Sequence, residues 1–210
     1  MGKEVFNVEL EKIKNKKVRA STEVILDLLP DYFYEIPASS SGRYHPAFSL
    51  GEGGLVRHVK VALRLLEEVF KDSVYGKFSD KKKDLMRMAV MLHDGFKSGK
   101  EYSGHTNVDH PVIMHDFILE NQDMLLITPK EAQFVANCIL THMGPWNTDK
   151  EGNVIMPVPK TREQKIVHTC DYFASRNFLN VHFENNEIAD SANREKTYVM
   201  TPRPTETPKE

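Results

Sequence analysis

The chain has 210 residues, of which 40% are hydrophobic and 28% are charged, and its formal net charge at pH 7 is −2. This composition predicts one globular domain with short appendages, and the balanced charge excludes a whole-surface basic footprint for duplex DNA. With two cysteines, no membrane-span-like apolar run and no signal peptide pattern, the chain is expected to be cytoplasmic rather than a disulfide-rich secreted or membrane protein.

The first part of the chain predicts an extension, a helix and a long loop. Residues 1–20 are highly charged with sparse apolar positions, and they predict an N-terminal extension with a short, mostly exposed helix. Ser21 is a candidate N-cap for the next helix, which Pro30 closes. Residues 37–54 are rich in Gly, Ser and Pro, and a loop of this length is often functional.

After this loop, apolar residues recur every three or four positions, which is the period of an amphipathic helix. The pattern predicts helices over residues 55–70, 81–97, 110–120, 129–142 and 162–179. A turn and a short apolar run predict a small β-hairpin near 146–158. Residues 184–210 are polar and become Pro-rich, and they predict a flexible C-terminal tail. The fold class is therefore all-α, with the helical domain over residues 21–183.

Several of the nine histidines lie on or beside these apolar stripes together with two aspartates. The candidate metal ligands, each on a predicted helix, are His58, His93, Asp94, His110, His142 and Asp171. Imidazole nitrogens and carboxylate oxygens together bind divalent cations of borderline hardness. A buried aspartate such as Asp171 is costly unless it is paired or binds a metal. A single histidine on an apolar face is more often a hydrogen-bonded core residue, so the hypothesis rests on the combination.

The sequence resembles the HD-domain superfamily of metal-dependent phosphohydrolases over residues 37–176. The segments that carry this resemblance are GGLVRH, LHDGFK, DHPVIM, ILTHMG and HTCDYFAS, and the loop segment GRYHPAF is similar to HD-domain 3′→5′ exoribonucleases. The family more often has Ile-Gly after His-Asp, where this chain has Gly95-Phe96. The resemblance implies an HD-like bundle of about six to eight helices around a metal site.

The resemblance also implies roles for the candidate residues. His58, His93, Asp94 and Asp171 match the ligands common to HD sites, while His110 and His142 match the extra histidines of dinuclear members. His105 competes with His110, which we favour because it shares a helical face with Met114 and Phe117. His115, His168 and His182 are interpreted as structural or surface residues.

The resulting hypothesis is a phosphohydrolase that cleaves a phosphomonoester or phosphodiester of a nucleotide or short single-stranded oligonucleotide. Two divalent ions are expected, and Mn, Fe, Ni, Co, Zn and Mg all suit the ligands. Asp94 is predicted to bridge them, and Lys97 is predicted to assist catalysis. The candidate substrate-binding residues are Lys97, His45, Arg43 and Arg176, with Tyr44, Phe48 and Trp146 as candidates for base stacking.

Two other functions remain open from the sequence. Some HD proteins are di-iron oxygenases with the same ligand set, and an HD domain can also bind a nucleotide without catalysis. Lys97 and the basic loop residues favour the hydrolase, and the intact ligand set argues against a non-catalytic domain. The oligomeric state is left open.

Overall fold

The computed structural model describes residues 2–39, 42–43 and 45–189, and it confirms the predicted all-α class. The helices are α1 (Asn7–Leu10), α2 (Lys16–Leu28), α3 (Gly54–Lys71), α4 (Asp80–Leu92), α5 (His110–Glu120), α6 (Pro129–Leu140) and α7 (Arg162–Ala174). Short 3-10 turns lie at Lys3–Phe6, Asp31–Tyr34, Ala47–Ser49 and Gln122–Met124. Tyr44 and residues 190–210, which include most of the predicted tail, lie outside the described residues. None of the described helices is both long enough and apolar enough to cross a membrane.

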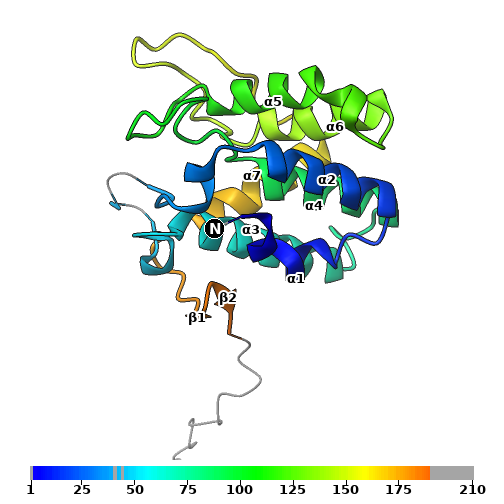
Figure 1. The fold of residues 1–210 in the computed structure, drawn as a ribbon, viewed down its shortest axis with the longest axis horizontal. Coiled ribbons are helices and arrows are strands. Elements are labelled where there is room, and N and C mark those ends of the chain that lie inside the picture. The colour runs from blue at the N-terminus through cyan, green and yellow to red at the C-terminus, as the bar shows by residue number, and fades with distance from the viewer. Residues whose placement is uncertain (1, 40–41, 44, 190–210) are drawn as a thin grey trace, which may run out of the picture.

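Helix α4 lies in the middle of the bundle, where it packs against α2, α3, α6 and α7 (Figure 1). Its second half is buried on almost every side, through Leu85, Met86, Met88, Ala89, Val90, Met91 and Leu92. A helix that is covered all round must be apolar all round, which explains the run of methionines. Because α5 packs on α6 and α3 packs on α7, the C-terminal end of α4 is also enclosed by other helices.

The N-terminal segment is more buried than the sequence predicts. Phe6, Leu10 and Ile13 are each at most 2% exposed and belong to the same hydrophobic core as the central helices. The expectation of a mostly exposed helix is therefore wrong for these side chains, because three widely spaced apolar residues are enough to seat a short segment on the bundle.

Helix α2 begins earlier than predicted. The side chain of Asn15 accepts hydrogen bonds from the backbone N–H groups of Lys17 and Val18, which makes Asn15 the N-cap. Ser21 is instead buried inside the helix, and its hydroxyl accepts a hydrogen bond from the Leu126 N–H at 2.8 Å. The predicted boundary between residues 20 and 21 thus falls within α2.

The two-stranded hairpin lies later in the chain than predicted. Residues 146–158 turn back through one isolated antiparallel bridge between Thr148 and Val154. The regular pairing joins β1 (Phe183–Glu184) to β2 (Glu187–Ile188). The predicted start of the tail, at residue 184, therefore falls inside this hairpin.

Two basic side chains of α3 hold this hairpin against the bundle. Arg57 Nη1 donates to Asn186 Oδ1 at 2.7 Å, and Lys60 Nζ lies 2.5 Å from Glu187 Oε1. Arg57 also donates to the carbonyl of Phe48 at 2.5 Å and to those of Leu50 and Glu52, both at 2.9 Å. The loop before α3 and the C-terminal hairpin are therefore fastened to the same helix.

Candidate metal centre

The chain turns sharply inside the core directly after α4. The predicted helix over 81–97 ends at Leu92, and the following residues form tight turns in which the Gly95 N–H donates to the Leu92 carbonyl at 2.9 Å. A Cβ atom on Gly95 would lie 2.8 Å from side-chain atoms of both Leu29 and Met114. A side chain at position 95 would require the ends of the Leu29 and Met114 side chains to shift, so the packing favours glycine here. The turn leaves His93 and Asp94 in the centre of the bundle.

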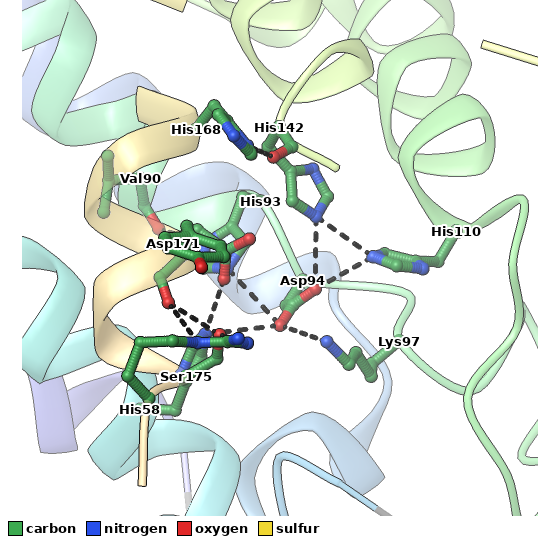
Figure 2. Close-up of polar contacts among 12 residues, drawn as sticks. His58, Val90, His93, Asp94, Lys97, His110, His142, His168, Asp171 and Ser175 are labelled. Atoms are coloured by element: carbon green, nitrogen blue, oxygen red, sulfur yellow. Dashed lines mark hydrogen bonds and ion pairs between the residues drawn. The ribbon is translucent and has the colours of Figure 1, made fainter. Parts of the chain in front are cut away.

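The six predicted ligands converge in two groups that share Asp94 (Figure 2). The first group combines α3, the end of α4 and α7, and its members are His58, His93, Asp94 and Asp171. The second group consists of Asp94, His110 and His142. His110 is the first residue of α5, and His142 is the second residue after the end of α6. In each group the candidate ligand atoms lie within 4.8 Å of one another. These groups could hold metal ions.

The two carboxylate oxygens of Asp94 face different groups. Asp94 Oδ1 lies 2.9 Å from His110 Nε2 and 3.6 Å from His142 Nε2. Asp94 Oδ2 lies 3.3 Å from His93 Nε2 and 3.7 Å from His58 Nε2. One buried carboxylate is therefore placed between two sets of imidazoles.

Backbone carbonyls set the orientation of three of these imidazoles. In each case Nδ1 donates to the carbonyl three residues earlier, at 2.7 Å for His93, 2.6 Å for His110 and 2.8 Å for His142. A neutral ring held in this way presents a lone pair on Nε2. Such a contact from the second ring nitrogen is the usual support of a metal-binding histidine.

The second group brings together atoms that all accept protons or cations. His110 Nε2 and His142 Nε2 are 3.2 Å apart, and both face Asp94 Oδ1. Among the described residues, His93 Nε2 and Asp94 Oδ1 are buried without a hydrogen-bond partner. Buried lone pairs that face one another are costly unless a cation or proton lies between them. This donor set fits divalent cations.

The electrostatics keep both carboxylates charged. Burial alone would raise the pKa of Asp94, but Lys97 and His93 hold this pKa well below its usual range. Burial likewise opposes the charge on Asp171, but its hydrogen bond with His58 and the nearby His93 ring keep its pKa well below the usual value. Two buried carboxylates make the centre attractive to cations.

The pKa values of two histidines of the centre are shifted in opposite directions. Burial opposes protonation of His93, yet Asp94 and Asp171 raise its pKa to about 10. Burial lowers the pKa of His142 to about 4, so this imidazole is neutral near pH 7.

Two predicted substrate-binding residues flank the first group. Lys97 Nζ lies 2.8 Å from Asp94 Oδ2. His45, in the loop pinned by Arg57, has its ring centroid 5.9 Å from that of His58. Its Nδ1 has no hydrogen-bond partner among the described residues, and burial, followed by the charges of His58 and Lys97, lowers its pKa to about 4. Both residues lie beside the cluster without belonging to either ligand group.

The remaining predicted residues lie outside the cluster. Arg43 is exposed, and Arg176 lies over the ring of Tyr172, 4.3 Å from its centroid. Of the two competing histidines, His110 lies in the second group, whereas His105 is exposed and its Nδ1 contacts the Ser103 carbonyl.

His168 has a supporting role that the sequence interpretation did not assign. Its Nδ1 donates to the backbone carbonyl of His142 at 2.6 Å. Its position one helical turn before Asp171 was the available signal, because residues three apart share a helix face.

Comparisons of the chain with protein-family models, curated proteins and solved structures gave no match. The fold and the site define an all-α protein with a buried His/Asp cluster that could hold metal.

Proposed function

We propose that this protein is a metal-dependent phosphohydrolase of the HD-domain type that cleaves a phosphate ester of a nucleotide or short oligonucleotide. The observation that carries the proposal is the shared carboxylate, because Asp94 directs Oδ1 to one ligand group and Oδ2 to the other. His58, His93, Asp94 and Asp171 would hold one ion, and Asp94, His110 and His142 would hold the other.

Bound divalent cations would supply positive charge for phosphoryl oxygens and a water of lowered pKa. The protein's own groups then have separate tasks. Lys97 keeps an ammonium group beside Asp94, where it can bind a phosphoryl oxygen or the leaving oxygen. Asp171 has the only partly exposed side chain of the six ligand candidates, at 16%, so we expect the substrate to approach from its side.

The ligand set alone does not separate a hydrolase from a di-iron oxygenase. The ion pair of Lys97 with Asp94 Oδ2 favours the hydrolase, because a cationic donor at the cluster suits an anionic phosphoryl group. His45, whose ring centroid lies 5.9 Å from that of His58, adds a second polar group beside the first ligand group.

The test combines metal analysis of the purified protein with a screen of phosphate esters. We expect two metal ions per chain and phosphate release with at least one divalent metal. Asp94→Asn should lose metal and reduce turnover by more than about 100-fold, because loss of even a supporting partner typically costs about 10–100-fold. Asp116→Asn is the matched control, since Asp116 is 56% exposed and outside the cluster.

The alternatives give different results. Oxygen consumption by the iron-loaded protein without phosphate release would identify an oxygenase. Tight nucleotide binding without turnover under any divalent metal would identify a non-catalytic domain. If Asp94→Asn retains wild-type metal content and turnover, the assignment of the site is wrong.

A further inference from the structure

A row of flat side chains runs along α7 next to the cluster. His168 and Tyr172 are four residues apart on α7 and therefore share one face, and Arg176 follows just after the end of this helix. The ring centroids of His168 and Tyr172 are 6.1 Å apart, and the Arg176 guanidinium lies 4.3 Å from the centroid of Tyr172. Trp146, from the loop after α6, stacks on Tyr172 with a centroid distance of 5.6 Å and an interplanar angle of 13°.

This row is joined directly to both ligand groups. His168 donates to the backbone carbonyl of His142, a member of the second group, and Figure 2 shows the two residues side by side. Tyr172 follows Asp171 in the chain, and Asp171 belongs to the first group. We therefore expect a ligand whose phosphate lies at the cluster to reach the aromatic row with its other end.

The exposure of Trp146 beside this row points to a flat ligand. Trp146 stacks on Tyr172 and yet keeps 52% of its surface exposed. An indole that is fixed by a ring behind it presents an ordered surface for a further ring. Arg176, and Lys165 in a hollow of about 420 Å³ beside His168, add positive charge that complements phosphate groups.

We propose that Trp146, backed by Tyr172, is a nucleobase-stacking platform, so that the substrate is a nucleotide whose base rests on Trp146. The position of its phosphate at the His/Asp cluster rests on the proposed function, whereas the stacking of the base does not. Stacking on aromatic side chains tolerates any base, because every base has a flat face.

The experiment uses the fluorescence of Trp146, which is the only tryptophan of the chain. The full-length, metal-loaded protein is titrated with adenosine 5′-thiophosphate, which resists hydrolysis, and separately with inorganic thiophosphate, which lacks the base. We expect the nucleotide analogue to quench the fluorescence and to bind at least about tenfold more tightly than thiophosphate. Equal affinities without quenching would overturn the platform and leave this surface for contact with a protein partner.

Substitutions distinguish a loss of base stacking from a loss of folding or metal binding. Tyr172→Leu should weaken binding of the analogue about tenfold while leaving metal content and thiophosphate affinity unchanged. Tyr75→Leu is the matched control, since Tyr75 is 62% exposed on the turn after α3, and it should bind like the wild type. Trp146→Phe, followed by calorimetry, should retain most of the affinity because it keeps an aromatic ring. Wild-type affinity in Tyr172→Leu would contradict the proposal.

The titration does not depend on turnover. Quenching by the analogue in a protein that hydrolyses no phosphate ester would support the platform and contradict the hydrolase. Phosphate release without quenching would support the hydrolase and contradict the platform.

Discussion

Asp94 is surrounded by groups whose orientation the backbone determines before any ligand binds. Three imidazoles point Nε2 toward the centre because Nδ1 is bonded to a carbonyl three residues earlier. The rings therefore need little rearrangement on binding a cation, and preorganisation of this kind lowers the cost of binding. Lys97 balances part of the negative charge from outside the ligand groups.

The first residue-scale prediction concerns His45. His45→Ala should lower kcat/KM about 10- to 100-fold with unchanged metal content, because a hydrogen bond to a charged group contributes about 1.5–3 kcal/mol. The reason is that Nδ1 has no hydrogen-bond partner within the described part of the chain, while the ring lies beside His58 and outside both ligand groups. Steady-state kinetics and metal analysis check it. His105→Ala is the control, since His105 is exposed, and a loss of metal in His45→Ala would make His45 a ligand instead.

The sequence predicts which ligands come together better than it predicts the hydrogen bonds that orient them. His110 was preferred over His105 because it shares a helical face with Met114, and α5 does begin at His110 with Met114 fully buried. The carbonyl partners of the imidazoles could not be predicted, because they depend on how each helix ends or begins. His168 is interpreted as structural or surface from the sequence, but its partner is not predictable, since it is a backbone atom 26 residues away.

At the scale of elements, the start of a helix is predictable where an N-cap residue or a proline marks it. The helix predicted from Thr161 has a capping box between Thr161 and Gln164, and α6 begins at Pro129 as predicted. The end of α4 was not predictable, because the apolar period continues through Phe96 while the backbone has already turned at Gly95. The turn brings Gly95 against Leu29 and Met114, which are distant in sequence, so the sequence pattern of α4 alone does not mark it.

The turn after α6 gives an element-scale prediction. Gly144 has φ +61°, and a Cβ atom there would lie 2.3 Å from His168 Cε1. Gly144→Ala should therefore displace His168 from the His142 carbonyl, destabilise the protein and weaken metal binding. Urea denaturation followed by circular dichroism measures the first effect, and metal titration measures the second.

The control for this variant has the same backbone strain without the collision. Gly51 has φ +68°, and no atom of the residues that the structure describes lies within 4 Å of the added Cβ. In each variant the alanine must adopt a left-handed backbone conformation, which lowers the free energy of unfolding by about 1–2 kcal/mol. We expect Gly144→Ala to lower it by about 1–3 kcal/mol more, because the added methyl group overpacks its site. Equal stability of the two variants, with equal metal affinity, would show that His168 does not support the centre through this contact.

At the scale of the whole molecule, the charged centre occupies the place where a bundle of this size would otherwise be most apolar. Among the described residues, the segments that meet there come from five helices or helix ends that lie far apart in sequence, between His58 and Asp171. Folding therefore places carboxylates and imidazoles together in the core, where burial changes their affinity for protons. The stability of the metal-free protein should accordingly depend on pH.

The direction of this dependence follows from His45 and His142, whose pKa values in the folded protein are both lowered to about 4 from the ordinary 6.5. The unfolded chain binds more protons than the folded chain between these values, so stability is lost as the pH falls from 6.5 toward 4. His93 adds nothing to this window, because its raised pKa of about 10 keeps it protonated in the folded state, and its contribution is lost only as the pH rises above 6.5 toward 10. Asp94 and Asp171 contribute a further loss only below their ordinary pKa of 3.8.

We therefore expect the metal-free protein to lose on the order of 3 kcal/mol of unfolding free energy between pH 7 and pH 5, measured by urea denaturation. His142→Asn should flatten this slope, because it removes one of the two histidines held neutral by burial. His182→Asn should keep the wild-type slope, since His182 is exposed. An unchanged urea midpoint between pH 7 and pH 5 in the wild type would contradict the burial of neutral imidazoles at the centre.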